Sequence, residues 1–184
     1  MYSHKSTAGA LLAAVLLAAC ASTSDTTTSS TPTRGPNLGA TPSAAMLAAM
    51  DTSIPPSGAG LPAGSGTVAQ GAKVYAAKCE SCHGPKGAGK PADPLVGGIG
   101  SLASGKPMRT VGSYWPYATT FFDYVRRAMP TNAPQTLTDD EVYAVSAYVL
   151  NLNGIIPESA VMNAQTLPQV KMPNRDGFID YSRK

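Results

Sequence analysis

Residues 71–84 read GAKVYAAKCESCHG, and this stretch decides how the chain folds. The residues before its first cysteine have a helical pattern, and Thr67 or Ser65 can cap a helix that runs to about Lys78. The apolar stripe of this helix consists of Val68, Ala72, Tyr75 and Ala76. Gly71 in mid-helix costs about 1 kcal/mol relative to alanine. A close contact between this helix and a second helix would explain the glycine.

The second helix is predicted near the other end of the chain. Thr138 and Glu141 form a capping box, because the threonine can accept from the N3 amide while the glutamate reaches back. The helix reads EVYAVSAYVLNLN and ends at Gly154, a residue suited to the position after a helix. Its apolar stripe consists of Val142, Val145, Val149 and Leu152, with Tyr148 beside it.

Cys79, Cys82 and His83 form the motif Cys-x-x-Cys-His. A zinc site would need two more cysteine or histidine ligands, and the only other histidine, His4, lies in the N-terminal segment described below. A redox dithiol fits poorly, because no βαβ pattern surrounds the motif. The spacing instead lets two thiols add to the two vinyl groups of one haem and places the histidine under the iron. We therefore expect one covalent haem c held by Cys79 and Cys82, with His83 as the proximal ligand.

The stretch from Gly71 to Gly84 resembles class I cytochrome c, with Gly71 and Tyr75 at the family's spacing before the first cysteine. The resemblance implies an all-α fold whose N- and C-terminal helices cross over the covalently bound haem. In that family the helices cross at such a glycine and an aromatic residue. We therefore expect Gly71 and Tyr75 to pack on Tyr148, and residues from about 155 to form a C-terminal extension.

Met129 is the candidate distal ligand of the iron. It follows a helix predicted from about Ala118, precedes Pro130, which stops a helix, and resembles the Ala-Met-Pro ligand loop of class I cytochromes. Met108 is the alternative, and Met172 is expected to pack on the domain surface. Coordination by histidine and methionine leaves no open site on the iron, which favours electron transfer. If Met129 does not bind, a haem sensor or a peroxidase-like domain is the alternative.

Further haem contacts are predicted from side-chain chemistry and from the resemblance. Pro94 matches the family's proline whose carbonyl accepts from the proximal imidazole and fixes its orientation. Tyr114 and Trp115 combine apolar bulk with one donor, so they are candidate donors to a haem propionate or, alternatively, ordinary core aromatics. Arg109 can reach a propionate as well. The pair Arg126–Arg127 is expected to form a solvated face or a docking patch.

The N-terminal third of the chain has the composition of a targeting signal followed by a linker. Residues 1–20 contain an apolar run of about a dozen residues, too short for a spanning helix of about 20. They end in Leu-Ala-Ala-Cys, which resembles a lipobox and implies lipidation of Cys20 after removal of a signal peptide. Residues 21–66 are rich in Ser, Thr, Pro, Gly and Ala and are predicted to be a disordered linker. The domain is then residues 67–184, on the periplasmic side of the inner or outer membrane.

The segments RTVGSYWPYATTFFDYVRRAMP and LNGIIPESAVMNAQTLPQVKMPNRDGF resemble the cytochrome subunits that accept electrons from molybdenum sulfite or sulfane dehydrogenases in sulfur-oxidising bacteria. The resemblance implies such an oxidoreductase as electron donor and a further cytochrome or oxidase as acceptor. The sulfane dehydrogenase cytochrome has two haems, whereas this chain has one attachment motif. The alternative is a general carrier for other dehydrogenases. A formal net charge of +3 without a basic run gives no support to nucleic-acid binding.

Overall fold

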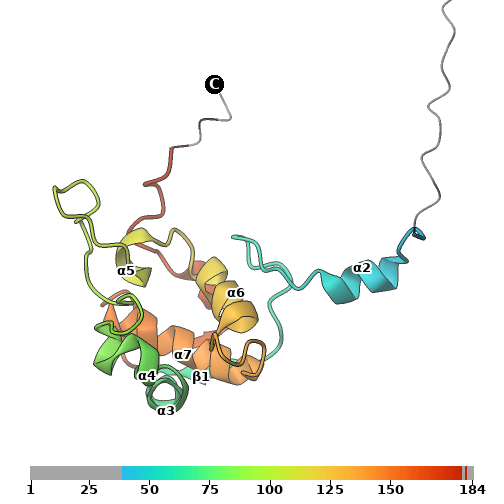
Figure 1. Ribbon diagram of the computed structural model, residues 1–184, viewed down its shortest axis with the longest axis horizontal. Coiled ribbons are helices and arrows are strands. Elements are labelled where there is room, and N and C mark those ends of the chain that lie inside the picture. The colour runs from blue at the N-terminus through green and yellow to red at the C-terminus, as the bar shows by residue number, and fades with distance from the viewer. Residues whose placement is uncertain (1–38, 180, 182–184) are drawn as a thin grey trace, which may run out of the picture. The chain divides into compact units, whose positions relative to one another are not determined.

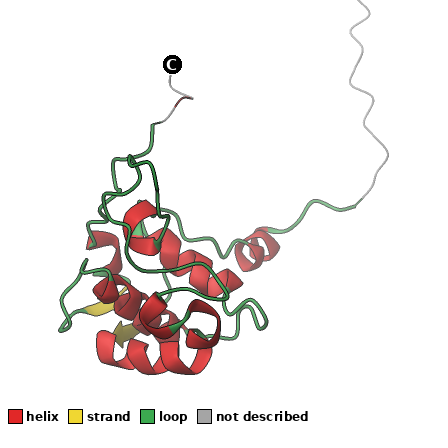
Figure 2. Cartoon of the chain, turned by 60° about the vertical axis from the view of Figure 1, so that its left-hand side comes forward, coloured by secondary structure: helices red, strands yellow, loops and turns green. Residues whose placement is uncertain are grey.

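The computed structural model describes residues 39–179 and 181, and its elements are mostly helices (Figure 1). In chain order they are α2 (Ala44–Met50), β1 (Ser65–Thr67), α3 (Val68–Lys78), α4 (Glu80–His83), the 3₁₀ turn η2 (Pro85–Gly87), α5 (Val111–Tyr114), α6 (Ala118–Ala128), α7 (Asp139–Leu152), β2 (Val161–Asn163) and the 3₁₀ turn η3 (Leu167–Gln169). The all-α prediction is confirmed for the architecture, with one addition. The short strands β1 and β2 pair antiparallel (Figure 2). Among the described residues, no helix has the length and apolar content to cross a membrane.

The predicted crossing of two helices is confirmed in α3 and α7. A Cβ on Gly71 would overlap the carbonyl oxygen of Ala144, so the two backbones touch at this point. The rings of Tyr75 and Tyr148 lie 5.3 Å apart, inclined by 53°. Gly66 of β1 also lies against Ala144, where a Cβ would overlap the backbone nitrogen. Both glycines are therefore required because the Ala144 backbone lies so close to them, and not because they adopt a special backbone conformation.

The ends of the two crossing helices are capped as the sequence predicts. Thr67 caps α3, with Gln70 completing a capping box, while Ser65 belongs to β1. Thr138 and Glu141 make the capping box of α7. The C-terminal end of α7 turns at Gly154 with a φ of 69°. Two hydrogen bonds close that end, from Gly154 N to Asn151 O at 2.8 Å and from Ile155 N to Leu150 O at 3.0 Å, which is a Schellman motif.

The predicted apolar stripes are largely correct. Val68 and Tyr75 of α3 are buried, as are Val142, Val145 and Val149 of α7. The prediction that Ala76 belongs to the buried stripe is wrong, since this residue is exposed. The buried face of α3 consists of Val68, Gly71 and Tyr75, so it is narrower than predicted and does not include Ala76.

The C-terminal extension is part of the core. Met162, Leu167, Val170 and Met172 are all buried, with exposed fractions of 8 % or less. The prediction that Met172 packs on the surface is therefore wrong, because the chain after α7 returns across the domain through β2 and η3. In the β1–β2 pair, Gly66 stands opposite Met162, which brings the extension directly beside the start of α3.

A segment before α3, residues 53–66, also packs on the domain, and we call it the entry strap. Ile54 is only 3 % exposed, and its N–H donates to Asp123 at 2.9 Å. Thr119 donates to the carbonyl of Pro56 at 3.1 Å, and Tyr143 donates to the carbonyl of Pro62 at 2.8 Å. The prediction of a disordered linker is therefore wrong for the entry strap. The strap is held chiefly through its backbone, which its Ser-, Pro- and Gly-rich composition does not reveal.

Candidate functional site

The motif residues lie where α3 passes into α4. Cys79 ends α3 and begins α4, and its carbonyl accepts from the backbone N–H groups of Cys82 at 3.1 Å and His83 at 3.0 Å. A single helical turn thus carries both thiols and the imidazole. The two cysteines do not form a disulfide with each other. Burial raises the pKa of the Cys79 thiol to about 11, the opposite of the lowered pKa found in redox dithiols.

A tight loop folds back on this turn. Gly84 has a φ of 72°, and a Cβ there would overlap the carbonyl oxygen of Gly89, so only glycine fits. Gly89 N donates to His83 O at 2.7 Å, and Ala92 N donates to Cys82 O at 2.8 Å. From the other side, the buried Tyr75 hydroxyl donates to Gly84 O at 2.8 Å. The loop and α3 together hold the motif in one conformation.

The imidazole of His83 is oriented by a backbone carbonyl. Its Nδ1 lies 3.2 Å from the carbonyl oxygen of Asp93. A carbonyl can only accept, so Nδ1 carries the proton and Nε2 keeps its lone pair for a metal. The predicted acceptor, the carbonyl of Pro94, is wrong by one residue. The reason is local: Ala92 N and Leu95 N are bound back to the loop, and the turn between them aims the Asp93 carbonyl at the ring.

Met129 lies at the point where α6 stops being helical. It caps α6 with extended backbone angles, φ −117° and ψ 147°, while its N–H still donates to Val125 O at 3.1 Å. Its side chain is half-buried against the core. The Thr131 hydroxyl donates to the thioether sulfur at 3.5 Å. A thioether sulfur has two lone pairs, so this contact leaves one for a metal.

The two aromatic candidates lie in different surroundings. Trp115 is half-buried, with its ring 5.8 Å from that of Phe121 and 5.6 Å from that of Tyr124. Tyr114 is 38 % exposed, and its ring lies 5.3 Å from that of Phe178 in the C-terminal extension. The guanidinium of Arg109 stands 5.6 Å over the Tyr114 ring. Their role as propionate donors stays a prediction.

Met108 is on the histidine side of the site. It lines a pocket of about 360 Å³ together with Asp93, Pro94, Pro107 and Arg109. Asp93 and Pro94 belong to the turn that orients the imidazole. Met108 therefore lies beside this turn, whereas Met129 lies at the end of α6.

The described residues contain no cluster of three or more His, Cys, Asp or Glu side chains that could bind a metal ion. A zinc site is therefore not formed by that part of the chain. The donors that these residues offer are two thiols on one turn, the imidazole of His83, and the Met129 thioether at the end of α6. This donor set fits covalent haem c, for which thiols and two axial ligands are needed.

Comparison with known proteins shows the family of this chain. The family model for cytochrome c matches residues 68–153. A chain in the crystal structure of the sulfane dehydrogenase SoxCD from Paracoccus pantotrophus is 41 % identical, with a TM-score of 0.73, over 80 % of this chain and 73 % of that one. This chain belongs to the cytochrome c family. No curated protein matches it.

The cytochrome carries one covalently attached haem c and is an electron-transfer protein. Sequence reasoning named the cysteines, His83 and Met129 as candidate haem-binding residues, but it missed the contacts that orient them. No sequence pattern indicated that the Asp93 carbonyl and the Thr131 hydroxyl would contact these side chains. The Tyr75 hydroxyl could have been found, because a buried tyrosine so close to the motif needs an acceptor.

Proposed function

We propose that this cytochrome is a lipid-anchored periplasmic carrier that takes single electrons from a molybdenum sulfite or sulfane dehydrogenase and passes them to the respiratory chain. The observation that carries the proposal is the 41 % identity with a chain of a sulfane dehydrogenase structure, which extends over 80 % of this chain. The matching domain of the family model is 68–153, so the wider likeness includes segments outside the common cytochrome domain.

The chain's own residues supply a complete attachment. Cys79 and Cys82 would form the two thioether links, His83 would bind the iron through Nε2, and Met129 would supply the second protein ligand. The haem supplies reversible one-electron chemistry at the iron. The Asp93 carbonyl keeps the imidazole in its orientation and raises its basicity through the hydrogen bond at Nδ1.

Met129 is favoured over Met108 by its position. A haem held by His83 would need its second protein ligand on the other face of the ring. Met108 lines a pocket together with Asp93, whose carbonyl binds the histidine ring, which favours a place beside His83 rather than opposite it. Met129 projects from the end of α6, on a different element. With both axial positions filled, electron transfer is favoured over oxygen or peroxide chemistry.

The membrane anchor is the second part of the proposal. It rests on Cys20 and the lipobox-like residues before it, which lie outside the described residues. Export to the periplasm and acylation of Cys20 by a lipid follow from that sequence. A Cys20→Ser variant should be released into the soluble periplasmic fraction, while the native protein should stay with the membrane. Equal distribution of the two would overturn the anchor.

The electron donor is tested by stopped-flow kinetics. The oxidised cytochrome is mixed with a molybdenum sulfite or sulfane dehydrogenase and its substrate, and reduction is followed in the haem absorption. The control donor is an unrelated dehydrogenase of similar potential. Reduction at least tenfold faster by the molybdenum enzyme supports a dedicated partner. Equally slow reduction by both donors would favour a general carrier.

A further inference from the structure

We propose that Asp123 is a positioning residue for Met129: it clamps the last turn of α6 to the entry strap and so fixes the direction in which the methionine leaves the helix. This inference rests on the proposed ligation of the iron by Met129. Asp123 contacts neither that sulfur nor the motif residues. It acts through Arg127 and through the backbone of Ile54.

The direction of Met129 depends on the turn before it. Met129 is the first residue after α6, and its N–H is still bound to Val125 O. Any rotation or fraying of the last turn therefore moves the thioether. Helix ends fray unless side chains or tertiary contacts hold them. Arg126 and Arg127 occupy this last turn, and each binds a carboxylate.

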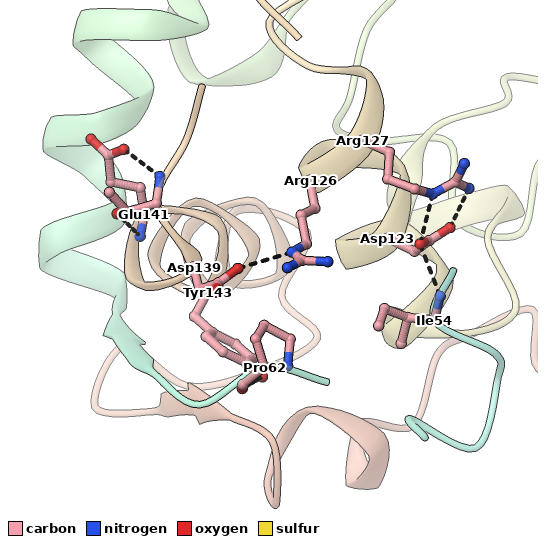
Figure 3. Close-up of polar contacts among 9 residues, drawn as sticks. Ile54, Pro62, Asp123, Arg126, Arg127, Asp139, Glu141 and Tyr143 are labelled. Atoms are coloured by element: carbon pink, nitrogen blue, oxygen red, sulfur yellow. Dashed lines mark hydrogen bonds and ion pairs between the residues drawn. The ribbon is translucent and has the colours of Figure 1, made fainter. Parts of the chain in front are cut away.

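The two arginines reach in different directions (Figure 3). Arg126 Nε donates to Asp139 Oδ1 at 2.9 Å, at the first residue of α7. Arg127 donates from Nε and Nη2 to the two oxygens of Asp123, at 2.9 and 2.5 Å, in a bidentate pair. The last turn is thus held to α7 on one side and to its own preceding turn on the other.

Asp123 extends the second pair to the entry strap. The same oxygen that accepts from Arg127 Nε accepts from Ile54 N at 2.9 Å. Ile54 is itself buried, so the strap cannot leave without exposing it. One turn before Asp123, Thr119 donates to the carbonyl of Pro56. Two points of contact therefore fasten the strap along α6, and one of them continues to Arg127.

The carboxylate of Asp123 is held in its charged form by its two partners, Arg127 and the backbone N–H of Ile54. Asp123 is 8 % exposed, and burial by itself would raise its pKa. The hydrogen bonds from Arg127 and from Ile54 N, together with the charges of Arg127 and Arg126, outweigh the burial and lower the pKa. The carboxylate is therefore ionised at neutral pH. Removing its charge leaves Arg127 free to turn into solvent, where nearly half of its side chain already lies.

The test uses the full-length protein with its haem, and compares the native chain with Asp123→Asn. The asparagine can still accept from Ile54 N but cannot make the bidentate charged pair with Arg127. The readout is the absorption band near the red end of the visible spectrum that reports iron–thioether bonding in the oxidised protein. Far-UV circular dichroism is followed over the same temperature range. The midpoint reduction potential is a second readout.

In Asp123→Asn we expect the band to be lost at a lower temperature than the helices melt. Loss of a charged hydrogen bond should raise the fraction of molecules that lack the iron–thioether bond, and hence the band, about tenfold at temperatures below melting. The reduction potential should fall, because methionine ligation raises it. Arg127→Gln should separate the loss of the band from the melting of the helices in the same way. It replaces Asp123→Asn as the test variant if Asp123→Asn does not fold.

The matched control is Glu141→Gln, which removes the ion pair of Glu141 with Lys78 between α3 and α7. The glutamine can keep the capping box of α7. Its band and its helices should be lost together. If Asp123→Asn also loses both together, or if Glu141→Gln separates them equally, Asp123 has only a structural role and the inference is overturned. Absence of the band from the native oxidised protein would instead overturn the ligation by Met129, and the positioning role with it.

Discussion

The α3–α7 crossing and the layer made by the entry strap and the C-terminal extension are held by different kinds of contact. At the crossing, two backbones touch, and Gly71 cannot gain even a methyl group without meeting Ala144. In the layer, side chains of α6 and α7 reach out to backbone groups of the strap, as Tyr143 does to Pro62 and Asp123 does to Ile54. Leu167 and its neighbours then cover the core from the extension.

The difference teaches which positions tolerate change. The crossing depends on residue size, so its glycine is visible as an anomaly in the sequence. Apart from the buried Ile54 and the tightly packed Gly66, the strap depends on the path of its backbone, so many residue types could serve at its other positions if the donors and acceptors on the helices stay. Substitutions on the helix side should therefore disturb the layer more than substitutions in the strap itself.

The largest loss of stability is expected for Leu167→Ala, which removes a buried side chain from the layer. Leu167 is fully buried, and removal of a buried leucine side chain destabilises by about 2–5 kcal/mol. Urea unfolding of the cytochrome measures the change. The control is Val161→Ala in β2, where the side chain is 41 % exposed and the loss should be much smaller. Equal losses would mean that the extension is not part of the core.

Gly71→Ala should come next and breaks the crossing. On an exposed helix this substitution stabilises by about 1 kcal/mol, but here the added methyl group overlaps the Ala144 backbone. We expect a net destabilisation of about 1–3 kcal/mol, typical of overpacking. Thermal unfolding measures it. Gly105→Ala, at a glycine with open space around it, is the control and should have little effect. A stabilising Gly71→Ala would show that the helices do not touch there.

Two tyrosine hydroxyls allow the crossing region and the layer to be compared directly, because each makes one 2.8 Å hydrogen bond to a carbonyl. Tyr143→Phe removes the bond to Pro62 in the layer, and Tyr75→Phe removes the bond to Gly84 beside the motif. Each should cost about 1 kcal/mol in urea unfolding. Burial raises the pKa of both tyrosines to about 12, so neither hydroxyl ionises below pH 10. If Tyr143→Phe is neutral while Tyr75→Phe is not, the strap is only loosely held.

The smallest effect is expected at the Lys78–Glu141 pair, which lies at 2.6 Å on the surface of the crossing. The hydrogen bond from Lys78 lowers the pKa of Glu141. The pair therefore stabilises the fold above the ordinary pKa of 4.5 and loses that contribution as pH falls through the lowered value. Both groups are partly exposed, so Glu141→Gln should cost less than about 1 kcal/mol at neutral pH.

The difference between native protein and Glu141→Gln should disappear in acid. Urea unfolding at neutral pH and at a pH below the lowered value measures it. A difference that persists in acid would mean that the charge of the glutamate is not what stabilises the fold, and that glutamine caps Thr138 less well than the native residue.

Much of the fold and of the candidate site was predictable because the signals are local. The haem motif is five consecutive residues, the capping box of Thr138 and Glu141 spans four, and the unexplained Gly71 pointed to a helix contact. The entry strap was missed because its polar and small residues resemble a disordered linker, whereas its ordering comes from donors on α6 and α7. The Pro94 prediction failed by one residue because the direction of a carbonyl depends on a turn that residue type alone does not determine.

The sequence by itself determined the covalent chemistry, the two crossing helices and the candidate ligands His83 and Met129, since each depends on neighbours a few positions away. Only the tertiary structure decided that Met172 is buried, that the Asp93 carbonyl orients the imidazole, and that Asp123 joins the entry strap to α6. The first and the last of these depend on parts of the chain that are far apart in sequence, and the Asp93 contact depends on the exact path of a loop. Their partners, 69 positions apart in the case of Ile54 and Asp123, leave no pattern in either local segment.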